Sequence, residues 1–191
     1  MAIEAFNLND RQRAERKLLI TVAEWKDENG SITIGTGSDA YKVSREILGT
    51  RTPDSSIEYN SDIETSTDIR GINYTDVNKT QPQQTLDPYT VLGGSTLGPF
   101  LDDLRARNAV SEYTDFTVYV ITAYIGNSTN GYKAQKHTGC TIVPTALGGE
   151  SFVNMPIEVH FSNDCDGTGK PGVGTVNSLA VDFEFTPESV G

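Results

Sequence analysis

The run Asp164-Cys165-Asp166-Gly167-Thr168 comes closest to a catalytic motif, because it matches the DxDGT pattern of aspartate-nucleophile phosphatases. That chemistry needs Asp164 as nucleophile, Asp166 as acid–base, Mg²⁺, and further Lys and Asp side chains from a parallel α/β sheet. The residues after Thr168 are too few to build such a sheet. Asp and Gly are also the residues that turns favour, so we predict a turn here and no catalytic role for either aspartate.

Two metal sites are conceivable on residue type. The same run resembles the start of a Ca²⁺ loop, but the position of the bidentate glutamate is occupied by Thr175. Zn²⁺ takes two Cys and two His in many proteins, and this chain holds His137, Cys140, His160 and Cys165. The spacings do not match a known zinc finger, and a buried Cys140 with His160 on a polar strand face is the simpler interpretation. We expect no metal and no cofactor.

Other signatures of enzymes are missing from the sequence, which has no GxSxG, no P-loop and no GxGxxG that opens a helix. Glu58, Asp62 and Glu64 could suggest a glycosidase pair, but they are two and four residues apart on one expected strand. Acidic side chains are common on solvated strand faces. We therefore predict that the protein is not an enzyme.

Composition and charge narrow the function further. The chain has 191 residues, which suggests one domain (1–191), and its formal net charge of −11 argues against a protein that grips nucleic acid. An acidic surface would still suit a protein past which DNA must slide. We find neither an apolar stretch of signal-peptide length at the start nor one long enough to span a membrane, so we expect synthesis in the cytoplasm and no membrane partner.

Alternating apolar and polar residues predict a mainly β fold. The Asn29-Gly30 pair predicts a hairpin between the first two strands, and Gly139 a bulge. A short helix is an alternative for the third strand. The predicted strands are 18–26, 31–34, 40–48, 57–64, 116–125, 132–143, 152–161 and 179–185.

One helix is predicted at 96–109. Pro99 suits its first turn, and Phe100, Leu101 and Leu104 can form an apolar stripe at helical spacing. The fold class that follows is a β-sandwich or barrel with one α-helix.

A long, mostly polar arm at about 65–90 interrupts the strands. Compact domains rarely keep a structureless loop of this length unless it has a function. Apolar residues recur along the arm and predict contacts with another subunit: Ile69, Ile72, Tyr74, Val77, Leu86 and Tyr89. We expect the arm to be mobile in the monomer and to become ordered on assembly.

The chain resembles the major tail (tail tube) proteins of long-tailed, siphovirus-like bacteriophages and prophages. The resemblance rests on an N-terminal strand pair, the arm TDIRGINYTDVNKTQPQQTLDPY, the helix PFLDDLRARNAV, and strands ending in GGESFVNMPIEVHFSND. It spans about residues 18–185, after an N-terminal arm of about 1–16, and depends on pattern rather than on an invariant motif.

The resemblance implies a structural virion subunit that forms hexameric rings, which stack into a hollow tube conducting DNA. Its implied partners are copies of itself, the tape measure, terminator and distal tail proteins, and passing double-stranded DNA that is not bound specifically. The long arm would contact the neighbouring ring. Acidic strand faces would line the lumen, and the candidate residues are Glu58, Asp62, Glu64, Asp182 and Glu184.

Two alternatives stay open. One is a non-enzymatic β-sandwich binding module, for example for carbohydrate, although Trp25 is the only Trp. The other is a different ring protein of the phage tail with the same fold, such as a terminator.

Overall fold

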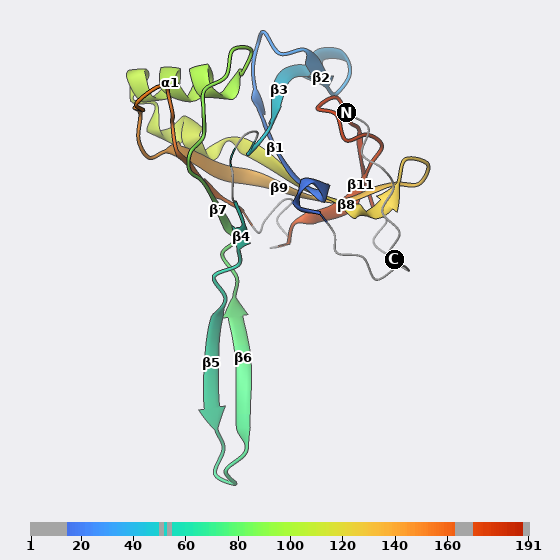
Figure 1. Ribbon diagram of the computed structural model, residues 1–191. Helices are drawn as coiled ribbons and strands as arrows, with labels where there is room; N and C mark the ends of the chain where they lie inside the picture. Colours follow the sequence, from blue (N-terminus) through green and yellow to red (C-terminus); the bar gives the residue numbers. More distant parts are fainter. Residues whose placement is uncertain (1–14, 50–51, 53–54, 163–169, 189–191) are drawn as a thin grey trace.

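The computed structural model describes residues 15–49, 52, 55–162 and 170–188, and it is mainly β with antiparallel sheets and one α-helix (Figure 1). The mainly β class predicted from the sequence is confirmed, and the architecture is consistent with a β-sandwich or barrel. The strands are β1 (Leu19–Lys26), β2 (Ile32–Ile34), β3 (Tyr41–Ile47), β4 (Ile57–Glu58), β5 (Asp62–Thr67), β6 (Asn73–Lys79), β7 (Gln83–Leu86), β8 (Phe116–Asn127), β9 (Gly131–Pro144), β10 (Ile157–His160), β11 (Gly172–Val176) and β12 (Phe185–Pro187). The helix is α1 (Leu97–Arg107), and short 3₁₀ turns lie at Arg16–Leu18, Gly37–Asp39 and Val110–Thr114.

The main sheet has the strand order β2-β3-β1-β8-β9-β10-β7-β4. Its centre is β8, whose sequence FTVYVITAYIGN is β-branched and aromatic and is buried on both faces over most of its length. Such a strand must lie between two apolar layers, which places β8 in the interior of the sheet.

β9 is the longest of the described strands, and along one edge it pairs with two different strands. Its first half pairs with β11 and its last residues pair with β10, while β8 lies along its other edge. Gly139 lies between the two halves at φ +68°, and the β8–β9 register shifts there. The bulge predicted at Gly139 is therefore confirmed, and it separates the two branches of the sheet.

The two faces of the sheet bury two separate cores. Ala23, Trp25 and Val118 contribute to the core on the α1 side. Val22 and Ile121 point to the opposite face, where the core includes residues from β11 and the chain after it. Alternation along β1 and β8 thus supplies both layers from the same strands.

The predicted helix is confirmed as α1. Leu101 and Leu104 are fully buried, and the Phe100 ring stacks on Trp25 with centroids 5.6 Å apart. The N-terminus of α1 is capped from β3, because the Glu46 carboxylate accepts hydrogen bonds from the backbone N–H of Thr96 at 2.8 Å and of Leu97 at 3.0 Å. A carboxylate at this end also complements the helix dipole.

On the opposite face, Arg45 holds the C-terminal chain against the sheet. Its Nε lies 2.6 Å from Glu24 Oε2, and the two side chains are only 3% and 8% exposed. Its Nη1 donates to the carbonyl oxygens of Phe183, at 2.7 Å, and of Val181, at 3.3 Å. The guanidinium also stacks over the ring of Phe183, and the hydroxyl of Tyr119 donates to Glu24.

The hairpin predicted at Asn29-Gly30 is wrong. β2 pairs with β3, and β3 lies between β2 and β1. The close approach of β3 explains Gly30, since a Cβ there would lie 2.3 Å from the carbonyl oxygen of Val43. Gly30 therefore makes room for a strand rather than for a two-residue turn.

Three other predicted strands are shorter than expected. The 57–64 strand breaks at Asn60, which has φ +38°, and so divides into β4 and β5. The 152–161 strand is reduced to β10, because Phe152 and Val153 lie in an exposed loop. Only Phe185 of the predicted 179–185 strand lies in a strand.

We predict that Arg45→Met will strongly destabilise the fold, because it leaves the Glu24 carboxylate buried without its cation. Loss of one partner from a buried pair costs about 3–5 kcal/mol. The free energy of unfolding from urea titrations measures this. The matched control is Arg105→Met, which breaks the exposed Asp102–Arg105 pair and should cost about 1 kcal/mol or less. Equal losses in the two variants would contradict the role given to Arg45.

Candidate functional site

A two-stranded hairpin, β5–β6, projects from the domain as its most distinctive surface (Figure 1). The strands form a sheet of their own, with Thr67 opposite Asn73 nearest the tip. At the base, the backbone N–H of Gln81 donates to the carbonyl oxygen of Tyr59 at 3.1 Å. Much of the arm expected to be a loop is therefore a regular hairpin, and its end is part of the main sheet as β7.

The hairpin tip is organised by Asp68. Its carboxylate accepts hydrogen bonds from the backbone N–H groups of Arg70, at 2.8 Å, and Ile72, at 2.9 Å. The Arg70 guanidinium lies 3.2 Å away, and the hydroxyl of Tyr74 lies 3.4 Å away. These donors, the Ile72 N–H first, hold the pKa of Asp68 below its ordinary value. Gly71, at φ +77°, completes the turn.

Apolar side chains are exposed on this organised tip. Ile69 is fully exposed, and Ile72 and Tyr74 are each 46% exposed. Exposed aliphatic side chains on a structured projection, rather than on the domain surface, indicate a contact surface for another molecule. Ile69, Ile72 and Tyr74 are thus positioned as the sequence predicted, although their contact with another subunit remains a prediction.

Leu86 and Tyr89 were also predicted to contact a neighbouring subunit, and for these two the prediction is wrong. Leu86 is fully buried on β7, and Tyr89 is 3% exposed with its hydroxyl hydrogen-bonded to Glu46. Burial and this carboxylate raise the pKa of Tyr89. Both side chains complete the core of their own domain. The side chain of Val77 lies outside the described residues.

The five candidate lumen residues are all exposed but do not form one acidic face. Asp62 and Glu64 lie on β5, Glu58 lies below the break at Asn60, and Asp182 and Glu184 lie in the segment before β12. The prediction of one continuous strand at 57–64 was wrong, because the chain divides at Asn60 and the apolar side of β5 is not buried, with Ile63 59% exposed. Because all five carboxylates are exposed, each of them could still line a solvent-filled channel.

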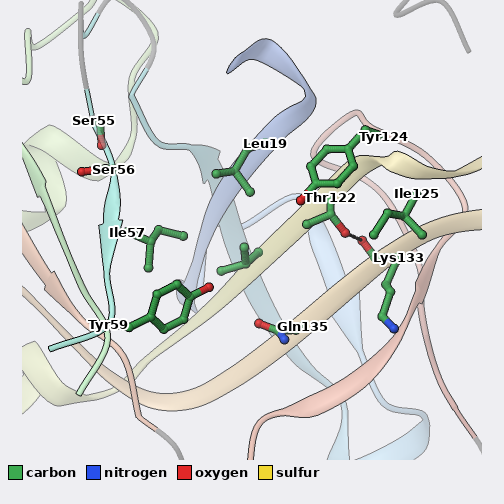
Figure 2. Close-up of a pocket in the computed structure, with 11 residues that line it drawn as sticks. Leu19, Ser55, Ser56, Ile57, Tyr59, Thr122, Tyr124, Ile125, Lys133 and Gln135 are labelled. Carbon is green, nitrogen blue, oxygen red and sulfur yellow. Dashed lines mark hydrogen bonds between the residues drawn. The ribbon is translucent and has the colours of Figure 1, made fainter. Parts of the chain in front are cut away.

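An open groove lies between β4, at the base of the hairpin, and strands β1, β8 and β9 of the same sheet (Figure 2). It has a volume of about 500 Å³. Tyr59 and Ile57 approach from the β4 side, while Leu19 and Tyr124 lie on the sheet. Among the described residues, the lining contains no carboxylate, His or Cys, and Lys133 supplies its one charged side chain. This lining suits the binding of an apolar or aromatic surface better than acid–base chemistry.

The structure brings His137 and Cys140 together around the backbone of Ser162. His137 Nδ1 lies 2.8 Å from the Ser162 carbonyl oxygen, and the Ser162 N–H donates to Cys140 Sγ at 3.4 Å. Both side chains are buried, and burial raises the pKa of the Cys140 thiol to about 11. His160 is exposed, with its Nε2 3.4 Å from Glu158. Here the thiol and imidazole hold a neighbouring chain segment in place.

Candidate metal ligands do not cluster among the described residues. Within 15–49, 52, 55–162 and 170–188, no group of three or more His, Cys, Asp or Glu side chains could hold a metal ion. Cys165, Asp164 and Asp166 lie outside the described residues, so neither the four-ligand zinc hypothesis nor the predicted turn is tested.

Two comparisons give no relative from which to transfer a function. A scan against models of protein families finds no match, and a search of curated proteins also finds none. None of the described helices is long and apolar enough to cross a membrane.

Sequence reasoning missed two surfaces. The groove joins Tyr59 to Tyr124, residues far apart in the chain, and no local pattern could reveal that. The loop containing Leu147, Phe152 and Val153 was assigned partly to a strand, although these side chains are 47%, 75% and 56% exposed. The Gly148-Gly149 pair predicts a turn just before this strand, but the loop in the structure extends past Val153 to the start of β10.

We predict that stability will fall as pH drops below about 6.5, the ordinary pKa of histidine. Burial lowers the pKa of His137 in the folded protein, so the unfolded chain takes up the proton first. The stabilisation that comes from burying neutral His137 is fully present above the pKa of this histidine in the unfolded chain, and it is lost as the pH falls below that value. Urea titrations between pH 7.5 and 5.5 measure the free energy of unfolding at each pH. His137→Asn should reduce the slope of that free energy against pH. His160→Asn, which alters the exposed histidine, should retain it. Identical slopes in the wild type and His137→Asn would contradict this prediction.

Proposed function

We propose that the protein is a non-enzymatic structural subunit of a phage tail tube, in which hexameric rings stack into a hollow tube that conducts DNA during ejection. The observation that carries the proposal is the β5–β6 hairpin, with its apolar tip fully outside the domain. The resemblance of the sequence to major tail proteins supports the same function. On this proposal the protein is located in the virion tail, after synthesis in the bacterial cytoplasm.

The hairpin supports assembly because it has little to stabilise it within its own chain. Isolated two-stranded hairpins are at best marginally stable in water. Its side chains at Ile63, Ile69 and Ile72 are all exposed. A second subunit that covered them would stabilise the hairpin and remove apolar surface from water at the same time.

Unpaired strand edges support closure into rings. β2 and β4 end the main strand path, and each pairs with one neighbour only. An open edge is an aggregation hazard in a monomer, whereas in a closed ring each edge can be covered by the next copy. The proposed partners are therefore further copies of the chain, with the tape measure, terminator and distal tail proteins at the ends of the tube.

A net charge of −11 supports passage of DNA without binding. Like charge on a channel wall keeps phosphate groups from adhering. We propose that the lumen wall draws on the exposed carboxylates at Glu58, Asp62, Glu64, Asp182 and Glu184. Double-stranded DNA is then a passing cargo, and no cofactor is required.

We predict that replacing residues 61–79 with a two-residue Asn-Gly turn will leave a folded subunit that forms no tubes. The cut is tolerable because Tyr59 and Gln81 are already hydrogen-bonded across the base. Circular dichroism and thermal unfolding check the fold, while electron microscopy and sedimentation check assembly. The control is Val110→Ser, which alters an exposed apolar residue outside the hairpin and the groove and should still polymerise. Normal tubes from the shortened chain would refute the proposal.

We predict that charge reversal at the lumen will separate assembly from ejection. Asp182→Lys with Glu184→Lys forms one variant, and Glu58→Lys forms another that lies outside the hairpin. Tubes should form in both, because each side chain is exposed in the subunit. Whichever variant places its lysine side chains in the lumen should slow DNA ejection. The measurement is the rate of DNA release from phage that carry the variant. If phage carrying either variant release DNA at the wild-type rate, none of these three residues lines the lumen.

The binding-module alternative has one observation in its favour, the groove with Tyr59 and Tyr124. Aromatic side chains beside polar ones are suited to binding a sugar ring. A glycan array with the purified protein, followed by Tyr59→Ala on any hit, tests this function. A monomeric protein with Tyr59-dependent glycan binding would replace the tube proposal.

A further inference from the structure

The exposed loop at 145–156, which we call the end loop, is a second organised apolar surface. Its exposed apolar side chains are Leu147, Phe152 and Val153, of which Phe152 is 75% exposed. Gly148 and Asn154 exchange two backbone hydrogen bonds across the loop, at 3.0 and 2.6 Å. The shape therefore comes from backbone bonding and is not imposed by burial of these side chains.

A glycine and a neighbouring segment fix the end loop further. Gly149 has φ +136°, and a Cβ there would lie 1.9 Å from the carbonyl oxygen of Phe152. The N–H of Val91 donates to the carbonyl oxygen of Val153 at 3.0 Å, which ties the loop to the chain before α1. Phe152 is thus held outward by a loop that only glycine at position 149 permits.

The end loop and the hairpin tip lie at opposite ends of the molecule. Figure 1 shows the orange loop beside α1, while the β5–β6 hairpin continues from β4 and β7 and extends away from α1. Ile69 is exposed on the hairpin tip, and Phe152 is exposed on the end loop. The two surfaces are different, so a contact between them is heterologous and leaves a free surface at each end.

The charges beside the two apolar surfaces are complementary. Arg70 is adjacent to Ile69 on the tip, and its side chain is 70% exposed despite the contact with Asp68. Glu150 lies on the end loop, is exposed, and has no ion pair with any other described residue. Opposite charges at the edge of an apolar contact favour one orientation and one partner.

We infer that the hairpin tip of one copy docks on the end loop of a second copy, with Ile69 against Phe152 and Arg70 beside Glu150. This inference rests on the proposed function, since it names the surface that receives the hairpin in the next ring. A heterologous contact whose rotation does not close into a ring gives an open array, so repetition of this contact between rings can add copies along the tube axis. The end loop is therefore the receiving half of the stacking contact.

Disulfide trapping tests the contact directly. Ile69→Cys and an affinity-tagged Phe152→Cys are made in a Cys165→Ser background, mixed and mildly oxidised. Cys140 remains in place, because it is buried and its pKa of about 11 keeps it in the unreactive thiol form. We expect mixed disulfide dimers on non-reducing gels. The matched control pairs Ile69→Cys with Val181→Cys, an exposed residue outside the end loop, and should give none.

A second variant measures the same contact without crosslinking. Phe152→Ser should leave ring formation unchanged in native mass spectrometry but raise the concentration needed for tubes at least tenfold. A charge swap adds specificity: Arg70→Glu and Glu150→Arg should each weaken stacking, and the double variant should recover it.

The outcomes separate this inference from the proposed function. Mixed crosslinks in short oligomers without tubes would support the tip–loop contact and overturn the tube. Wild-type tubes without mixed crosslinks, together with normal stacking of Phe152→Ser, would overturn the inference and leave the tube proposal standing. Crosslinked dimers of Ile69→Cys alone, joined tip to tip, would also overturn the inference.

Discussion

Two adjacent residues of β3 determine how the layers of this protein meet. Arg45 points to one face of the sheet, pairs with buried Glu24, and bonds to carbonyl oxygens of the C-terminal segment. Glu46 points to the other face and accepts the N–H groups that begin α1. Because neighbouring side chains in a strand face opposite ways, one dipeptide fastens a layer on each side. Neither contact survives a shift of β3 by one residue, so this pair also fixes the register of the strand.

The structure separates the residues that stabilise the subunit from those available to other molecules. The cores on both faces of the sheet include none of the exposed apolar residues on the hairpin tip or the end loop. Changes at Ile69 or Phe152 can therefore alter association while the fold persists. On the proposed function this independence suits a subunit that folds before it assembles, and it lets stability and association be tested with separate variants.

Sequence patterns predicted the elements that depend on local periodicity. β8, β9 and α1 were found because burial on one or both faces repeats at the period of a strand or helix. Gly30 misled because its role depends on Val43, thirteen residues away, and Asn-Gly alone predicts a turn. Leu86 and Tyr89 were mistaken for contact residues because the polar sequence before them hides the return of the chain into the sheet. Pairing between distant strands is a tertiary property that no short window contains.

The way the hairpin joins the sheet has a mechanical consequence. β6 leads through Gln81 into β7, whose four residues pair in register with β10, from Gln83 opposite His160 to Leu86 opposite Ile157. Tension applied along the hairpin therefore acts parallel to β7 and strains these hydrogen bonds together, in shear, instead of opening them one at a time. A projection anchored in this way resists extraction far better than one attached by a loop. The same short strand that contributes buried Leu86 to the core thus anchors the hairpin to the sheet.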